Sequence, residues 1–144
     1  MWYSPRVMSL PPQKFREIVL QLLFSQDFTA LDPAETIPFM MHELKVTKRS
    51  MLDVHIRLEA ILAKLPEIDA RIQAASTEYA FDRIGKVERT ILRLAIYELS
   101  DPNIPPKVAI AEAIRLCRKF GTPESANFVN AILDNVYSNQ PVSV

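Results

Sequence analysis

The sequence predicts an all-α fold, because apolar residues recur at helical spacing and proline divides the chain into segments. The 144 residues include two glycines and eleven prolines, and the apolar positions lack the alternation typical of strands. Proline is tolerated in the first turn of a helix but breaks its interior, so the prolines separate helices. We therefore expect one domain over residues 1–144 with about seven helices, and loose ends at about 1–10 and 138–144.

Proline and capping residues delimit the first four expected helices. An acidic capping box around Pro33 begins the second helix, and Pro38 kinks or shortens it. Thr47 is the expected N-cap of the third helix, and Pro66 begins the fourth. The expected ranges are about 12–26, a short helix from 33, 48–65 and 66–79.

The last three helices have equally clear limits. The fifth ends at the stretch "SDPNIPP", which cannot continue a helix. Pro106 begins the sixth, and Gly121 is expected to end it as a C-terminal cap. Thr122 and Pro123 then begin the seventh. The expected ranges are about 86–99, 106–120 and 123–137.

Composition narrows the possible functions. The chain has 17 Lys and Arg and 17 Asp and Glu, so its formal net charge is zero. RNA or DNA binding would therefore have to come from a local patch or be shared with a partner. Cys117 is the only cysteine, which leaves no intramolecular disulfide and makes the cytoplasm the expected location. Neither a signal peptide nor a membrane-spanning stretch is expected.

The stretch "VERTILRLAIYEL", Val87 to Leu99, carries apolar residues around most of its helical circumference. Such a wide apolar arc predicts a central helix that is contacted on several sides. Arg93 lies on the remaining side, whereas Glu98 falls inside the apolar arc, where a carboxylate needs a polar partner. Glu88 lies in the first turn, where a carboxylate suits the helix dipole, and it either serves only that purpose or also binds a partner.

Two aromatic residues lie off the main apolar stripes. Leu20 and Phe24 point away from the stripe of the first helix. Either that helix is sandwiched between two layers, or Phe24 is an exposed anchor for another protein. Phe128 lies at the border of the apolar face of the last helix, where it either packs or stacks on an unpaired RNA base.

The sixth helix is expected to be the most asymmetric. One face is apolar and includes Cys117. The other is a basic stripe, which is either an ordinary solvated face or a surface for phosphate contacts. The stripe consists of Lys107, Arg115, Arg118 and Lys119, with Glu112 as its only acid.

Catalysis finds little support in the sequence. The chain has no Gly-rich phosphate loop, and "HELKV" is not an H-E-x-x-H zinc site. The expected apolar surroundings of Cys117 are those of an inert thiol. We therefore expect no enzyme activity, no metal and no cofactor.

Three ordered segments resemble the signature segments of the NusB family of bacterial transcription antitermination factors. They are "VERTILRLAIYEL", "IPPKVAIAEAIRLCRKFG" and "ESANFVNAILD". The segments "REIVLQLLF" and "EYAFDRIGKVER" are also similar to the corresponding parts of that family. The family fold is all-α, with two three-helix bundles packed roughly perpendicular, and the resemblance implies this NusB-like fold here.

What the resemblance implies is binding and not chemistry. Members bind the boxA element of nascent RNA together with the ribosomal protein NusE. The pair joins RNA polymerase with the other Nus factors, so that ribosomal RNA transcription passes terminators. A basic partner would supply charge that this neutral chain lacks. The sequence leaves open whether the chain also forms a homodimer.

The resemblance also implies site residues, by position. Phe24 and Glu88 match family positions that contact NusE. The RNA face implied by the family comprises Lys14, Arg16, Lys107, Asn127 and Phe128, with Arg93 as an additional candidate. The basic stripe, and not the resemblance, adds Arg115, Arg118 and Lys119.

The sequence departs from the family pattern at two places. The run "LPPQKFRE" has prolines where the family usually has arginines, and Ala111 replaces the usual asparagine. Each lost phosphate contact weakens RNA affinity. An alternative function is therefore a protein-interaction module of the same fold with weak or lost RNA binding. A third, the substrate-binding domain of an RNA cytosine methyltransferase, is disfavoured because the sequence has no cofactor-binding loop.

Overall fold

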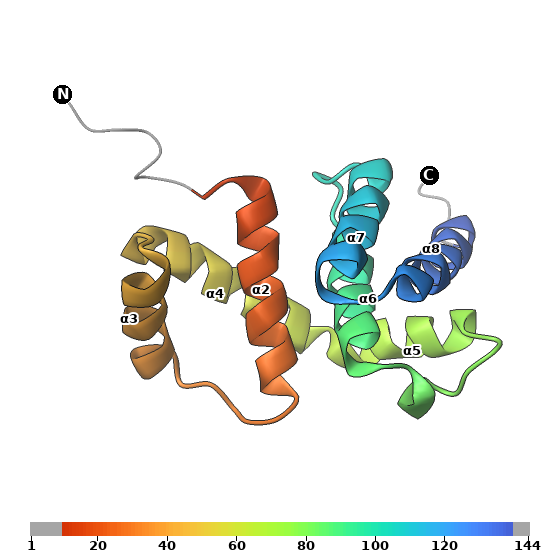
Figure 1. Ribbon diagram of the computed structural model, residues 1–144, viewed down its shortest axis with the longest axis horizontal. Coiled ribbons are helices and arrows are strands. Elements are labelled where there is room, and N and C mark those ends of the chain that lie inside the picture. The colour runs from red at the N-terminus through yellow and green to blue at the C-terminus, as the bar shows by residue number, and fades with distance from the viewer. Residues whose placement is uncertain (1–9, 140–144) are drawn as a thin grey trace. The chain divides into compact units, whose positions relative to one another are not determined.

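Helices account for all regular structure in residues 10–139, the part of the chain that the computed structural model describes (Figure 1). The prediction of an all-α fold with about seven helices is confirmed. Residues 1–9 and 140–144, most of the two ends expected to be loose, lie outside the described residues. The elements are α2 (Pro12–Gln26), α3 (Pro33–Leu44), α4 (Lys48–Ala63), α5 (Leu65–Ala75), the 3₁₀ helix η1 (Phe81–Arg83), α6 (Lys86–Leu99), α7 (Pro106–Phe120) and α8 (Pro123–Ser138).

The chain divides into two compact units, Met1–Ala63 (unit 1) and Lys64–Val144 (unit 2). In unit 1, α4 contacts both α2 and α3. Asp32 caps α3 as expected, because its side chain accepts a hydrogen bond of 3.0 Å from the Ala34 N–H. Pro38 does not end α3, which continues to Leu44. The core of unit 1 is formed by Ile18, Val19, Leu22, Leu23, Met51, Val54, Leu58 and Ile61.

In unit 2, α6 is the central helix and contacts α5, α7 and α8 (Figure 1). Nine of its 14 residues are buried, including Glu98. The prediction of a central helix contacted on several sides is confirmed. Thr122 caps α8 by a capping box, in which the Ser125 N–H donates to the Thr122 hydroxyl and the Thr122 N–H donates to the Ser125 hydroxyl.

The segment 76–85, which joins α5 to α6, differs from the sequence-based expectation. We expected a helix to continue to about Tyr79, but α5 ends at Ala75 because the backbone of Ser76 is extended. The Ser76 hydroxyl then donates a hydrogen bond of 2.7 Å to the Tyr79 carbonyl. A serine hydroxyl that bonds to nearby backbone favours a turn over continued helix. Residues 76–85 therefore form a loop that contains η1.

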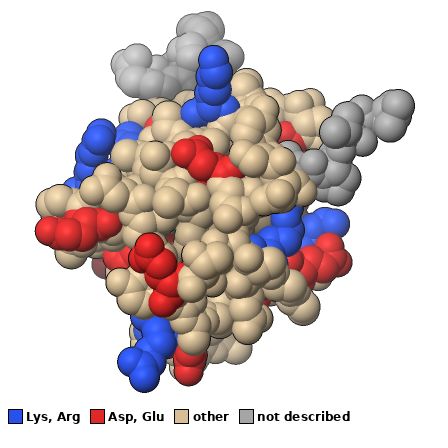
Figure 2. Space-filling view, turned by 90° about the vertical axis from the view of Figure 1, so that its right-hand side faces the viewer, with Lys and Arg blue, Asp and Glu red and all other residues tan. Residues whose placement is uncertain are grey.

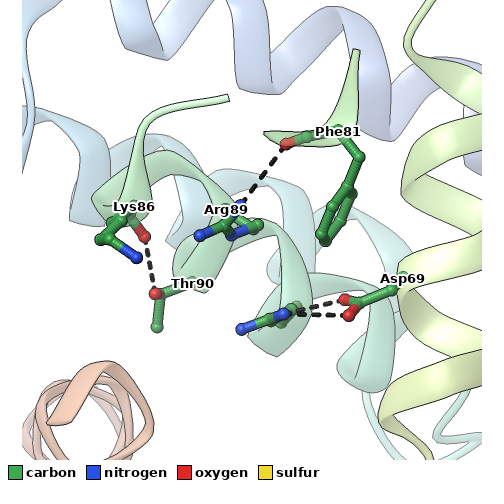
Figure 3. A network of polar contacts seen from close by, with 6 residues as sticks. Asp69, Phe81, Lys86, Arg89 and Thr90 are labelled. Atoms are coloured by element: carbon green, nitrogen blue, oxygen red, sulfur yellow. Dashed lines mark hydrogen bonds and ion pairs between the residues drawn. The ribbon is translucent and has the colours of Figure 1, made fainter. Parts of the chain in front are cut away.

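The polar side of α6 is tied to α5 and to this loop (Figure 3). Arg93 makes a bidentate ion pair with Asp69 of α5, with N···O distances of 2.8 and 2.9 Å. The Phe81 ring lies beneath two guanidinium groups, 5.1 Å from that of Arg89 and 5.8 Å from that of Arg93. Arg89 also donates a hydrogen bond of 3.5 Å to the Phe81 carbonyl. The two arginines therefore hold η1 against the helix by charge-assisted and cation–π contacts.

We expect Asp69→Asn to lower the free energy of unfolding by about 2–3 kcal/mol, because it leaves the buried Arg93 guanidinium without its carboxylate. Urea denaturation would measure the loss. Asp53→Asn is the matched control, since Asp53, whose side chain is 46% exposed, pairs at the surface with Arg49, whose side chain is 79% exposed. The control should change stability by no more than about 0.5 kcal/mol. Equal effects of the two substitutions would contradict the structural role of the Arg93–Asp69 pair.

Candidate functional site

Unit 2 contains a hollow of about 670 Å³, lined by the loop 76–85, the first turn of α6 and one side of α8. Its volume lies within the range of small-ligand sites. Glu88, Asn127 and Phe128, which the resemblance assigned to two different partners, all line it. The structure therefore brings part of the predicted NusE site and part of the predicted RNA site to one surface. Its charged lining residues are Glu78, Arg83, Glu88 and Glu124.

The carboxylate of Glu88 lies between two glycines. A Cβ atom added to Gly85 would collide with one carboxylate oxygen, and a Cβ atom added to Gly121 would lie 3.3 Å from the other. Glu88 is half-buried and lies three residues after Gly85, in the first turn of α6. The absence of side chains at both glycines therefore creates the space that this carboxylate occupies.

Tyr79 is a residue of the hollow that sequence reasoning missed. Its ring packs edge-to-face against Phe128, with a centroid distance of 5.6 Å and an interplanar angle of 73°. Phe128 is half-buried, whereas Asn127, beside it on α8, is exposed. Sequence analysis missed this pair because it placed Tyr79 at the end of a helix. Nothing about such a position indicates that the tyrosine lies beside α8. The one available signal was an aromatic residue in the "EYAFDRIGKVER" segment.

The basic stripe on α7 is less uniform than its sequence suggested. Lys107, Arg118 and Lys119 are exposed, but Arg115 makes a bidentate ion pair with Glu112 at 3.0 and 3.1 Å. The exposed cations therefore lie near the two ends of α7, about 16 Å apart for a helical rise of 1.5 Å per residue. On the face that Figure 2 shows, basic and acidic side chains are interspersed, and the basic ones do not gather at one place.

The remaining predicted residues of the RNA and NusE sites lie on α2. Lys14 is exposed in its first turn and Arg16 is half-buried. Phe24 is half-buried near the C-terminal end, with its ring centroid 5.2 Å from that of Phe28, whereas Leu20 is buried. Thus Leu20 belongs to the core, whereas part of Phe24 remains accessible.

The assignment of Arg93 to the RNA face needs correction. Arg93 is 7% exposed, and Asp69 engages its guanidinium on two nitrogens. A phosphate would have to displace that carboxylate and enter a buried position, which costs more than contact with an exposed cation. Arg93 therefore supports the loop 76–85 and is removed from the set of RNA contacts.

Cys117 is buried on α7. The pKa of its thiol is raised to about 11, mainly because burial disfavours the thiolate; a hydrogen bond with Ser125 partly opposes this shift, and the Glu88 carboxylate adds to it. The thiol is therefore protonated at neutral pH, as its expected apolar surroundings suggested. Within residues 10–139, no group of three or more His, Cys, Asp or Glu side chains could hold a metal ion. Over the same range, every helix is too short or too polar to cross a membrane.

Comparison with known proteins agrees with the resemblance. A model of the NusB family matches residues 13–138. The transcription antitermination protein NusB of Geobacter sulfurreducens is 38% identical over 130 residues, which cover 88% of this chain and 93% of the relative. The corresponding protein of Chlamydia pneumoniae is 34% identical over 134 residues, covering 92% and 84%.

Solved structures show the same fold. NusB of T. maritima superposes with a TM-score of 0.78 at 32% identity, covering 92% of this chain and 94% of that one. A chain in a crystal structure of antitermination factors NusB and NusE in complex with dsRNA gives a TM-score of 0.74 at 23% identity, covering 89% and 96%. The predicted NusB-like fold is confirmed. Because the family model matches most of the sequence and several relatives exceed 30% identity, this chain belongs to the NusB family.

Proposed function

We propose that this chain is a transcription antitermination factor that binds boxA-type RNA together with the ribosomal protein NusE. It acts with RNA polymerase and the other Nus factors in the cytoplasm, and it promotes processive transcription of ribosomal RNA by binding and not by catalysis. Relatives named transcription antitermination proteins support this function. The observation that carries it is the hollow of unit 2, where residues assigned to RNA and to NusE share one surface.

The distribution of charge supports a division of the RNA contacts. Exposed cations on α7 and at the start of α2 contact phosphates, whereas the Phe128 ring contacts a base. Phosphate contacts supply affinity without regard to sequence. Because the formal net charge is zero, few such contacts are available, and a basic partner adds to them. The cations in this set are Lys14, Lys107, Arg118 and Lys119.

We expect Lys107→Ala and Arg118→Ala each to weaken binding of a boxA-type RNA. Each should also reduce the slope of log affinity against log salt by about 0.7, the value for one phosphate contact on single-stranded nucleic acid. Fluorescence anisotropy at several salt concentrations would measure both effects.

The matched control for these cations is Lys48→Ala, an exposed cation at the start of α4 that belongs to no predicted site. It should leave the affinity and the salt slope close to those of the unmodified protein. If all three variants gave the same salt slope as the unmodified protein, the proposal that α7 contacts phosphates would be wrong.

A protein-interaction module with weak RNA binding is the second candidate function. The ion pairs of Arg93 and Arg115 favour it, because they remove two predicted cations from the RNA face. So do the acidic lining of the hollow and the prolines at the start of α2. Binding of NusE without any contribution from RNA would identify this function.

We expect Phe24→Ala and Glu88→Gln each to weaken binding of NusE about fivefold or more, because loss of a central anchor at an interface, or of its charge, costs more than about 1 kcal/mol. Titration calorimetry with purified NusE would measure this. Phe39→Ala and Glu67→Gln are matched controls, since both residues are exposed on helices outside the predicted site. An unchanged affinity for both test variants would remove these residues from the NusE interface.

A further inference from the structure

We propose that Tyr79 is a second base-stacking residue, and that it forms with Phe128 an aromatic clamp for one unpaired nucleobase of the bound RNA. The clamp lies in the hollow of unit 2. This inference rests on the proposed function, because the base comes from the RNA. Tyr79 belongs neither to the sites implied by the family resemblance nor to the basic stripe.

The two rings leave aromatic surface available for stacking. Tyr79 is 52% exposed, and Phe128 is half-buried beside it. In an edge-to-face pair, the edge of one ring covers at most one face of the other, so the remaining faces are not covered by the pair itself. Every base has a flat π-face that stacks on such rings.

Tyr79 is also held in place before any ligand binds. The Ser76 hydroxyl donates to its carbonyl at 2.7 Å. Two residues further along, Phe81 is held by Arg89 and Arg93, as Figure 3 shows for the contacts of Phe81 with Arg89. A side chain on an ordered loop loses less conformational entropy when it binds. The loop thus holds a half-exposed aromatic ring at a defined position.

The chemistry of the hollow favours a base over an arginine side chain from a protein. Besides carboxylates, it is lined by the amides of Asn127 and Asn135 and the hydroxyls of Ser76 and Thr77. A base edge has both donors and acceptors and can use all of these groups. A guanidinium has donors only, so it would leave the amide N–H groups unused.

The acidic groups specify how a base would enter. The charged lining residues are three acids, Glu78, Glu88 and Glu124, and one basic residue, Arg83. The acids repel phosphates, so a nucleobase enters the hollow while the RNA backbone stays outside. A carboxylate accepts a hydrogen bond from an exocyclic amino group, as glutamate does from cytosine. The hollow therefore favours a base that presents an amino group over uracil.

The test compares Tyr79→Ala with Tyr79→Phe and with Tyr137→Ala, in the full chain and with a boxA-type RNA oligonucleotide. Tyr137 is the matched control, because it is 48% exposed on α8 and does not line the hollow. Loss of one stacked base should weaken RNA binding between about fivefold and about 100-fold in Tyr79→Ala. The salt slope should stay unchanged, because no phosphate contact is lost. Tyr79→Phe and Tyr137→Ala should bind RNA like the unmodified protein.

A series of oligonucleotides with single abasic sites then identifies the base. At one position, and at no other, the abasic RNA should bind equally well to the unmodified protein and to Tyr79→Ala. Full affinity of Tyr79→Ala for the intact RNA would overturn the clamp and leave the proposed function standing. Weaker binding of Tyr79→Ala to NusE with unchanged binding to RNA would also overturn it, in favour of a protein ligand. Absence of RNA binding by the unmodified protein would overturn both the clamp and the proposed function.

Discussion

The bidentate ion pair between Arg93 and Asp69 connects the central helix α6 to α5, and the loop 76–85 depends on it. The same guanidinium lies over the Phe81 ring, so one side chain holds both a neighbouring helix and the loop. A largely buried ion pair adds little net stability compared with apolar packing, because both charges lose their hydration. Its main effect here is to define where the loop lies. The position of Tyr79, and with it one wall of the hollow, follows from that placement.

Charge in unit 2 is separated by location. Acidic side chains predominate among the charged residues that line the hollow. The exposed cations of α7 lie near the two ends of that helix. A nucleic acid carries its negative charge on the backbone and its hydrogen-bonding edges on the bases. The two environments therefore suit different parts of one RNA strand. A formal net charge of zero is consistent with such local separation, since it says nothing of where the charges lie.

The sequence was sufficient for the helices but not for the site. Proline and capping residues predicted the beginnings of α2, α3 and α8, since these signals act within one turn. No such signal marks the end of α5, which depends on the hydroxyl of Ser76. Arg93 was assigned to an RNA-binding face because a helical projection shows only the direction in which a side chain leaves its helix. It does not show which residues of other elements lie there. Its partner lies 24 residues earlier in the chain, and no local pattern indicates such a pairing.

Gly121 shows that a correctly predicted residue can be required for a different physical reason than the expected one. Gly121 was expected to end α7 as a C-terminal cap, and α7 does end there, but its φ of −112° is one that any residue can adopt, so conformation is not the reason for glycine at this position. An added Cβ atom would lie 2.7 Å from the Ser125 hydroxyl and 3.0 Å from the Cys117 carbonyl. Cys117 lies four residues before Gly121 and Ser125 four residues after it, so the tight turn from α7 into α8 is what requires glycine at this position. An added Cβ atom would also lie 3.3 Å from the Glu88 carboxylate, so this turn helps to determine where a predicted partner-binding group can lie.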